Sequence, residues 1–471
     1  MNTLVQYIPR GRTAKEISAS VEAGVRGGQL APGDHLPPVR ELAGRLGVSP
    51  TTVAAAYSDL RRRGITTGTG RAGTRIRGAP PVSSRVYLSA PAGTRDLITG
   101  GPDPDLLPLL PARPAMRTTR MYAEAPVAPR LRRLAAAQLA ADGIEAASLT
   151  VTGGALDGIE RVLATWLTPA DRVIVEDPGH AVTFDLIAAM GFIAVPVPVD
   201  DLGIRPAALE AALTRGAGAL IVTPRAQAAT GAAWDAGRAA EIAALLRRHR
   251  SVGVIEDDHA GPVAGVPAFS ACAGPAGFRP TRWVTLRSVS KSLGPDLRLA
   301  VMAGDEITVA RVAGRQALGT GWVSYLLQET VAELWSDASA MRALGTAAQV
   351  YTGRGVALRS ALAAHGITAS GRSGFTCWVP VADEDGVAAA LARGDGSADH
   401  PRGKPIPPDP PGRPPRQDIA AAGWAVAPGQ RFRIASPPGV RISFARLEEA
   451  DAASFAADFA RALRHRASRL D

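Results

Sequence analysis

The sequence predicts an α/β protein of two domains, a small helical head and a larger body built on a mostly parallel sheet. Two observations support this prediction. Residues 10–79 contain three stretches with helical periodicity followed by two short strands around a Gly-rich turn. From residue 111 onward, short apolar strands alternate with helical stretches, which is typical of strand–helix–strand units. A chain of 471 residues is long enough for both domains.

The head, residues 10–79, is expected to fold as a winged helix-turn-helix. Ile17, Val21 and Val25 recur four residues apart and form the apolar stripe of a first helix. The second helix, VRELAGRLG, ends at a glycine. The third, VSPTTVAAAYSDLRRRG, begins with a capping Ser49 and with Pro50 at its first position. In such folds the second helix of the pair enters the major groove of DNA, and the following hairpin reaches backbone or minor groove.

The charge distribution also favours a nucleic-acid partner for the head. The chain carries a net charge of +10, and residues 1–85 hold thirteen Lys or Arg against five acids. A local basic excess attracts phosphate polyanions and speeds association. Charge alone is equally consistent with a solvated basic surface. The order of helices and hairpin is what makes double-stranded DNA the expected partner.

Composition indicates a cytoplasmic protein. Cys272 and Cys377 lie far apart, so neither a disulfide framework nor a metal-ligand spacing is expected. The N-terminal residues lack the apolar core of a signal peptide. No stretch of about twenty uncharged apolar residues is present, so no membrane span is expected.

The body is expected to begin at residue 111, after a linker over residues 80–110 that is rich in Pro, Gly and Ser. Its predicted strands are SLTVT, DRVIVE, FIAVPV, GALIVT, VGVIED and RWVTL. Ligands of such sheets bind at the carboxyl ends of the strands. The Pro-rich, charged residues 392–418 are expected to form a mobile insertion in this 111–471 domain. A partner-docking role for that segment is the alternative.

One lysine in the body stands out. The chain has only three lysines, Lys15, Lys291 and Lys404, and otherwise uses arginine as its cation. A guanidinium stays protonated, whereas an ammonium can lose its proton and form a Schiff base with a carbonyl. Lys15 and Lys404 lie in an exposed helix start and a Pro-rich loop. Lys291 follows the strand RWVTL at the sheet edge where ligands bind, so it is the candidate for such chemistry.

The surroundings of Lys291 in the sequence match a phosphate-bearing aldehyde. Ser288, Ser290 and Arg298 lie close to it in the chain, and the turn TGGALDGIE offers a helix N-terminus to an anion. The strand VIEDDH ends in clustered acids, one of which could stabilise a protonated ring nitrogen. A metal site formed by Asp257, Asp258 and His259 is the competing interpretation, although no second ligand cluster accompanies it.

With these features together, the chain resembles the MocR subgroup of the GntR regulators, whose large domain is similar to fold-type I aminotransferases. In the head, GDHLPPVRELAGRLGVSPTTVAAAYSDLRRRG and GRAGTRI carry the resemblance. In the body, TGGPDPDLLP, VEDPGH, SVSKSLGPDLR and GVRISFA follow in the order and spacing of the subgroup. The resemblance covers nearly the whole chain and implies a homodimer that holds pyridoxal 5'-phosphate.

The resemblance also implies site residues. Lys291 takes the position of the Schiff-base lysine, and Asp257 that of the partner of the pyridine nitrogen. The phosphate would lie in a cup made by Ser288, Arg298, Gly154 and Ala155. Tyr122 matches a tyrosine that reaches the partner subunit's phosphate, and Arg441 an arginine that holds an effector carboxylate. The residues expected to contact DNA are Arg40, Thr51, Thr52 and Gly73.

Several positions depart from the pattern. His180 stands where a ring-stacking tyrosine is expected, and His259 where a tyrosine usually donates to the cofactor's phenolate oxygen. Both imidazoles can stack or donate a hydrogen bond. Ala228 and Ala229 replace an Asn-Pro type pair, which removes one tuning contact. Pro50 stands where relatives often have Arg, which favours phosphate or wing contacts over base reading. These changes predict retained cofactor binding with poor turnover.

Three hypotheses follow from the sequence. The leading one is a transcriptional regulator that binds an operator and senses an amine, amino acid or vitamin B6 ligand through the cofactor on Lys291. Ligand binding would then change domain closure and move the heads, because a ligand shifts two states only by differential affinity. The second is an active aminotransferase with an accessory DNA-binding domain. The third is a DNA-binding protein whose large domain only dimerises.

Overall fold

The structure is a computed structural model that describes residues 7–31, 33–62, 65–67, 73–76, 88–111, 121–122, 124–144, 148–272, 279–394 and 423–470. The chain divides into two compact units, one of which begins at the N-terminus and contains the whole winged domain. We call residues 7–76 the head and the residues from 88 onward the body. Each is described by itself.

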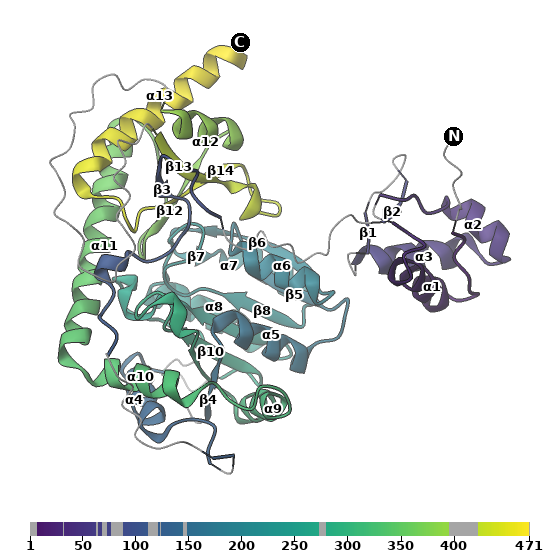
Figure 1. Ribbon diagram of the computed structural model, residues 1–471, viewed down its shortest axis with the longest axis horizontal. Helices are drawn as coiled ribbons and strands as arrows, with labels where there is room; N and C mark the ends of the chain where they lie inside the picture. Colours follow the sequence, from purple (N-terminus) through teal and green to yellow (C-terminus); the bar gives the residue numbers. More distant parts are fainter. Residues whose placement is uncertain are drawn as a thin grey trace. The chain divides into compact units, whose positions relative to one another are not determined.

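The head contains helices α1 (Ala14–Arg26), α2 (Val39–Leu46) and α3 (Pro50–Arg62), followed by the short antiparallel pair β1 (Thr66–Thr67) and β2 (Arg75–Ile76) (Figure 1). The expected winged helix-turn-helix is therefore confirmed. Thr13 caps α1 and exchanges hydrogen bonds with Glu16. Ser49 caps α3 by accepting from Thr52 N at 3.2 Å.

A single apolar core holds the head together. Helix α3 packs against both α1 and α2, and the inward positions come from the apolar stripe that the sequence shows. The fully buried side chains of this core include Ile17, Val21, Leu42, Val53, Tyr57 and Leu60. Tyr57 also donates its hydroxyl proton to Pro37 O at 2.8 Å, which satisfies its only polar group inside the core.

The body is organised around an eight-stranded sheet of order β4-β11-β10-β9-β8-β5-β6-β7. Strands β8, β9 and β10 pair in parallel. Strand β11 pairs antiparallel with both β10 and β4, so β4 runs in the direction of β10. The strands are β4 (Ser148–Thr152), β5 (Arg172–Asp177), β6 (Ile193–Asp200), β7 (Gly203–Ile204), β8 (Ala219–Val222), β9 (Gly253–Asp258), β10 (Trp283–Ser288) and β11 (Ala300–Gly304). The predicted mostly parallel α/β sheet is confirmed.

Helices cover the sheet, as expected for strands buried on both faces (Figure 1). They are α4 (Pro129–Ala141), α5 (Ala155–Trp166), α6 (Ala181–Ala189), α7 (Pro206–Thr214), α8 (Ala236–Arg248), α9 (Glu306–Ala317) and α10 (Tyr325–Ser336). The long helix α11 (Ala338–Ala364) leads to the C-terminal part of the body and packs against the last helix, α13 (Ala452–Leu470).

A second sheet of four strands, in the order β12-β14-β13-β3, corrects one boundary predicted from the sequence. Its strands are β12 (Thr376–Pro380), β14 (Gly439–Ser443), β13 (Gly423–Pro428) and β3 (Thr94–Leu97), and α12 (Glu384–Arg393) packs on β13. Strand β3 lies within the predicted linker 80–110 and pairs in parallel with β13. The body therefore begins before residue 111, because β13 supplies backbone partners to a segment whose own sequence has little strand character.

The predicted insertion, residues 392–418, lies almost entirely outside the described residues. Residues 392 and 393 belong to the end of α12, and the description resumes at the start of β13. Among the helices that the structure describes, none combines the length and the apolar character that crossing a bilayer requires. The predicted cytoplasmic location stays a prediction.

Candidate functional site

Lys291 lies in the turn that follows β10, at the carboxyl end of the parallel strands. Its Nζ donates a hydrogen bond to Gly100 O at 2.7 Å and lies 5.9 Å from the centre of the Phe375 ring. Burial, and then the positive charge of Arg441, lower the pKa of this lysine to about 8. An amine with that pKa is deprotonated in roughly a tenth of the molecules at pH 7, far more than an ordinary lysine, and nucleophilic attack on a carbonyl requires this free amine.

Asp257 lies near the end of β9, and 7% of its surface is exposed. No described residue donates a hydrogen bond to its Oδ1. Burial, and then the neighbouring Asp258 carboxylate, raise its pKa to about 7, while Lys291 opposes this rise. A buried carboxylate oxygen without a donor is costly, so this atom fits a partner that brings its own N–H.

His180 and His259 both lie close to the charges of Lys291 and Arg441. Burial is the largest cause that lowers the pKa of His180 to about 4 and that of His259 to about 3, with the nearby cations adding to it. Both rings are therefore neutral at physiological pH. A neutral imidazole can stack on an aromatic ring and donate one hydrogen bond, which are the two contacts expected at these positions.

Three of the four predicted phosphate-cup residues come together at the start of α5. Gly154 is the N-cap of this helix, with φ 110°, and Ala155 is its first residue. A Cβ on Gly154 would lie 2.9 Å from Arg298 Nη2, so the guanidinium lies directly beside this turn, and the positive φ favours glycine at the position. Arg298 is exposed, which leaves its donors accessible to a ligand. Together the residues offer backbone N–H groups and a cation to an anion.

Ser288, the fourth predicted member, is the buried last residue of β10. Its Oγ accepts a hydrogen bond from Ser290 N at 3.2 Å. No contact among the described residues joins it to Arg298 or to the start of α5. Its position at the same strand end as Lys291 is compatible with the predicted role and does not establish it.

Arg441 lies on β14 and is 7% exposed. Its Nε donates to Ala228 O at 2.8 Å and its Nη1 to Ile98 O at 3.2 Å, while its guanidinium carbon lies 5.0 Å from the centre of the Phe432 ring. Burial lowers its pKa to about 10, so it stays charged at neutral pH. Both of these hydrogen bonds end on neutral carbonyls, and a carboxylate would be a stronger acceptor.

The loop that carries Ala228 is ordered by a residue that sequence reasoning passed over. Gln227 Oε1 accepts from the backbone N–H groups of Ala229 and Thr230 at 2.9 and 2.8 Å, and its Nε2 donates to Pro178 O. Ala228 therefore contributes its carbonyl to Arg441, although its side chain offers no polar contact to a cofactor.

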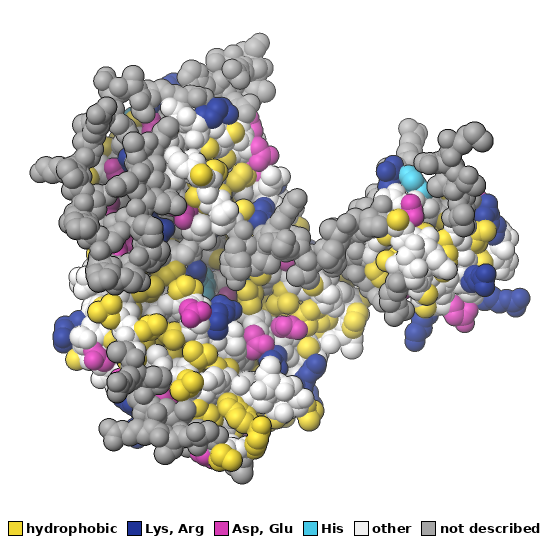
Figure 2. Space-filling model, viewed as in Figure 1, with side chains coloured by type: hydrophobic (Ala, Val, Ile, Leu, Met, Phe, Trp, Pro, Cys, Tyr) yellow, Lys and Arg dark blue, Asp and Glu magenta, His cyan; other side chains and the backbone are white. Residues whose placement is uncertain are grey.

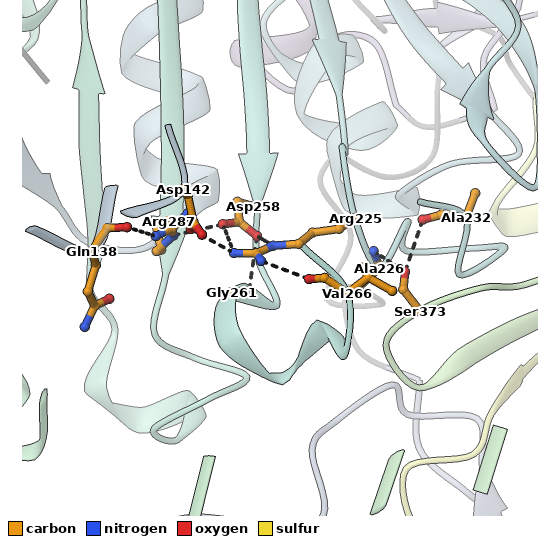
Figure 3. Close-up of polar contacts among 10 residues, drawn as sticks. All are labelled: Gln138, Asp142, Arg225, Ala226, Ala232, Asp258, Gly261, Val266, Arg287 and Ser373. Carbon is orange, nitrogen blue, oxygen red and sulfur yellow. Dashed lines mark hydrogen bonds and ion pairs between the residues drawn. The ribbon is translucent and has the colours of Figure 1, made fainter. Parts of the chain in front are cut away.

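Asp258, next to Asp257, belongs to a separate set of charges that we call the ion network: Arg225, Asp258, Arg287 and Asp142 (Figure 3). Arg225 donates through Nε and Nη2 to both oxygens of Asp258, each at 2.8 Å. Arg287 Nε donates to the same carboxylate at 2.9 Å, and its Nη2 lies 2.5 Å from Asp142. The two arginines hold the pKa of Asp258 far below its usual value, against the effect of burial.

The ion network argues against the metal-site interpretation of Asp257, Asp258 and His259. Each Asp258 oxygen accepts two hydrogen bonds, three of the four from guanidinium groups and one from Gly261 N at 3.2 Å, which leaves no lone pair directed at a cation. Within the described ranges, no cluster of acids, His and Cys has the arrangement to hold a metal ion. The strand end VIEDDH thus supplies one carboxylate to a network and one to the site around Lys291.

Tyr122 is not brought to this site within one chain. It is 89% exposed, and its ring packs edge-on against Trp322 with 5.7 Å between centroids. No described contact connects it to Lys291 or Arg298. Its role on the phosphate of a partner subunit stays a prediction.

The predicted DNA contacts lie on α2, in the first turn of α3 and on the wing. Arg40 is exposed on α2, and Thr51 and Thr52 form the first turn of α3, where both hydroxyls contact Ser49 Oγ. Gly73 has φ 73° and lies beside His35, next to the strand pair. Figure 2 shows Lys and Arg side chains around the rim of the head, where the exposed ones include Arg10, Arg12, Lys15, Arg40 and Arg45.

Sequence reasoning missed Gly100, Phe375 and the two network arginines Arg225 and Arg287. Gly100 belongs to the motif TGGPDPDLLP, but nothing in the sequence links it to Lys291, 191 positions away. The arginines carried no signal, because arginine is the ordinary cation throughout this chain. Only the alignment of β8, β9 and β10 places them around one carboxylate.

Comparisons with known proteins agree with this architecture. Residues 102–459 match the family of aminotransferases of class I and II, and residues 13–76 match the bacterial regulatory proteins of the gntR family. A kynurenine aminotransferase from Pyrococcus horikoshii has a TM-score of 0.63 at 18% identity, covering 79% of this chain and 90% of its own. A multiple substrate aminotransferase from Thermococcus profundus has a TM-score of 0.66 at 16% identity, with 80% and 93% covered.

Three relatives with a regulator's name match between about half and nearly all of this chain. The vitamin B6 salvage pathway transcriptional repressor PtsJ of Salmonella typhimurium is 37% identical over 96% of this chain and 99% of its own length. The transcriptional regulator TauR of Rhodobacter capsulatus is 26% identical over 78% and 83%. The pyridoxine biosynthesis regulator PdxR of Corynebacterium glutamicum is 30% identical over 52% and 55%.

The fold and the matches define a class: transcriptional regulators in which a winged helix-turn-helix precedes an aminotransferase-like domain. The chain belongs to this class, the MocR-type members of the GntR family, as its motifs predicted. The predicted regulator function is confirmed at this level. The alternative of an active aminotransferase is less well supported, because the relatives that match most of the chain are named as regulators.

Proposed function

We propose that this regulator binds operator DNA through its head and senses a small amine, amino acid or vitamin B6 compound through pyridoxal 5'-phosphate held at Lys291. The observation that carries the proposal is the buried Asp257 Oδ1 without a donor, on the strand next to the one that precedes Lys291. This carboxylate and this lysine are close enough to shift each other's pKa. A ring with a protonated nitrogen and an aldehyde satisfies both.

The remaining residues fit the same group. Gly154, Ala155 and Arg298 would hold its phosphate through backbone N–H groups and a guanidinium. His180 and His259 are neutral and would contact the ring, and Ser288 would complete the phosphate cup. When bound, this cofactor supplies an electrophilic carbon that condenses with amines. The chain's own contribution is to keep Lys291 partly deprotonated and Asp257 desolvated.

Arg441 would bind the carboxylate of an amino-acid effector. It is a buried cation that donates to two backbone carbonyls of the described residues, so a carboxylate would gain a charge-assisted, bidentate contact. The proposal favours an effector that carries both an amine and a carboxylate. A vitamin B6 compound alone would use Lys291 and the phosphate cup without Arg441.

The test of this function combines colour and DNA binding. Purified protein with added pyridoxal 5'-phosphate should turn yellow, Lys291→Ala should stay colourless, and Lys15→Ala should keep the colour. Operator affinity, measured with and without the cofactor and candidate amino acids, should change for the wild type and not for Lys291→Ala. A colourless wild type would instead favour the hypothesis that the body only dimerises.

The DNA contacts can be tested with a matched pair on α2. Arg40 and Arg45 are both exposed, but Arg45 is held by Glu41 at 2.7 Å. We propose that Arg40→Ala weakens operator binding by roughly 1–3 kcal/mol or lowers the salt slope by about 1. Arg45→Ala should change binding less, because its charge is already shared. If Arg40→Ala and Arg45→Ala weakened operator binding equally, α2 would contribute only a general electrostatic attraction to DNA.

We also propose that two chains form a homodimer. Several large apolar side chains of the body are exposed, namely Leu109, Leu110, Met121, Tyr122, Leu318 and Leu326. Figure 2 shows hydrophobic side chains gathered at one end of the body. Such exposure is typical of an interface. Sedimentation should give a dimer, and Met121→Asp with Leu326→Asp should shift it toward the monomer.

A further inference from the structure

The three residues Ile98, Thr99 and Gly100, which we call the strap, contact both cations of the candidate ligand site. The strap follows β3 directly. Lys291 Nζ donates to Gly100 O at 2.7 Å, and Arg441 Nη1 donates to Ile98 O at 3.2 Å. Two carbonyls of one short segment thus hold the lysine and the arginine that a ligand would need.

The strap also covers the remaining side of the arginine. Gly100 has φ 67°, and a Cβ built on it would overlap Arg441 Nη2. Arg441 Nε is occupied by Ala228 O at 2.8 Å. A carboxylate binds a guanidinium through two parallel N–H groups, either Nη1 with Nη2 or Nε with Nη2. Each of these pairs includes a nitrogen that the strap covers, so bidentate binding at Arg441 requires the strap to move.

The same holds for Lys291. A free ammonium carries three protons and can donate one to Gly100 O. When Lys291 has formed a Schiff base with a carbonyl carbon, its Nζ carries at most one proton. The Nζ must then face the ligand and no longer Gly100 O. Engagement of Lys291 and engagement of Arg441 therefore both weaken the hold on the strap.

The strap is well placed to pass this change on. Strand β3 before it is attached to the body through its pairing with β13. After it, Asp103 is fixed by Arg354 Nη1 at 2.8 Å and by the hydroxyl of Tyr351, which accepts from Asp103 N. In the other direction, residues 88–93 lead back along the chain toward the head. The strap is thus anchored on both sides, through β3 and through Asp103, so a displacement of the strap acts on β3, which residues 88–93 connect to the head along the chain.

We infer that the strap competes with a ligand for the donors of Lys291 and Arg441, and that displacement of the strap is the step that signals to the DNA-binding head. This inference rests on the proposed sensing function and adds its mechanism. It supplies the differential contacts that a two-state response requires, because the strap and the ligand compete for the same donors.

The chain offers a matched pair of variants for the test. Gly93 and Gly100 flank β3 and both have left-handed backbones, with φ 79° and 67°. A Cβ on Gly93 meets nothing within 4 Å, whereas one on Gly100 meets the Arg441 guanidinium. Gly93→Ala and Gly100→Ala therefore share the backbone strain, and only the second displaces the strap from Arg441.

Hydrogen exchange of the peptide that covers residues 88–101 reports the strap directly. The backbone N–H groups of Ile98 and Thr99 both donate to Asp96 Oδ1 at 3.0 Å, and a strap that has lost its contacts with the two cations opens these bonds more often. In the wild type, pyridoxal 5'-phosphate should therefore speed the exchange of this peptide by about tenfold. Gly100→Ala should exchange fast without any ligand and respond little to it. Its operator affinity should no longer depend on the cofactor, whereas Gly93→Ala should respond like the wild type.

The outcomes separate this inference from the sensing function. If the wild type turns yellow with the cofactor and the exchange of residues 88–101 stays the same, the strap is not displaced and the inference is wrong. If the wild type stays colourless, the sensing function is wrong. Hydrogen exchange of residues 88–101 in Lys291→Ala then tests whether Lys291 holds the strap. Exchange that rises in this variant without cofactor supports the hold on Gly100, and unchanged exchange rejects it.

Discussion

The ion network and the ligand site meet at the end of β9, and their carboxylates differ in hydrogen bonding. In the ion network, Asp258 accepts three hydrogen bonds from Arg225 and Arg287. In the ligand site, Asp257 Oδ1 has no donor among the described residues. The two carboxylates are consecutive in the chain and both buried. One has a pKa far below its usual value, and the other a pKa raised to about 7.

The comparison shows that a buried carboxylate can have two roles: it can stabilise the structure around it, or it can be available to bind a ligand. A buried charge that is fully paired tolerates desolvation and fixes the strands and loops around it. A buried charge left without a partner is destabilising in the free protein and becomes favourable only when a ligand supplies the missing contact. The ion network therefore fixes the end of β9, and this rigidity keeps Asp257 in place for a ligand.

The largest expected effect comes from breaking the ion network. Asp258→Asn should lower the free energy of unfolding by about 3–5 kcal/mol, because two buried guanidinium groups lose their buried counter-charge and keep only the partly exposed Asp142. Denaturant unfolding followed by circular dichroism measures this. The triple variant Arg225→Met, Asp258→Leu, Arg287→Met serves as control and should recover much of the loss. A loss below about 1 kcal/mol in Asp258→Asn would contradict the role given to the network.

Asp257→Asn should show the opposite profile. The free energy of unfolding should change by less than about 1 kcal/mol, since the side chain loses a charge that lacks a donor at Oδ1. Affinity for pyridoxal 5'-phosphate, measured by absorbance titration, should fall by about tenfold to a hundredfold. Glu256→Gln, on the same strand but bonded to Ser270 and Thr285, is the comparison variant and should retain the affinity.

Cofactor binding should depend on pH through the ligand site alone. Lys291, with its pKa lowered to about 8, must be deprotonated, and Asp257, with its pKa raised to about 7, must be ionised. Both conditions improve as the pH rises, so the rate of colour formation should increase through pH 7 to 8 and level off above. In Asp257→Asn the supporting negative charge is gone, which lowers the pKa of Lys291 and moves the plateau to lower pH. A rate independent of pH over this range would exclude both assignments.

The smallest effect is expected at the exposed end of the network. The Asp142 side chain is 27% exposed and lies 2.5 Å from Arg287 Nη2. Asp142→Asn should cost about 1 kcal/mol of unfolding free energy, because solvent screens this pair. Thermal unfolding beside Asp258→Asn gives the ratio directly. Equal losses at the two positions would mean that burial does not govern the network.

Much of the fold and part of the site followed from local sequence patterns. The helices of the head could be predicted from helical periodicity, the Ser49 cap and the helix end at Gly47, because these signals act within a few residues. Lys291 could be singled out because lysine is rare in this chain. Strand β3 could not be found, because it exists only through pairing with β13, more than 300 positions later. The contact between Lys291 and Gly100 was hidden for the same reason.

The order of elements, the two-domain class and the residue types available for chemistry are properties of the sequence itself, because capping, periodicity and side-chain reactivity are local. The pairing of charges was decided by the tertiary structure. Nothing in the string EDD distinguishes Asp257 from Asp258, and only the packing of β8, β9 and β10 brings arginines to one of them. Electrostatic environment depends on neighbours in space, and long-range folding alone determines which neighbours a buried carboxylate receives.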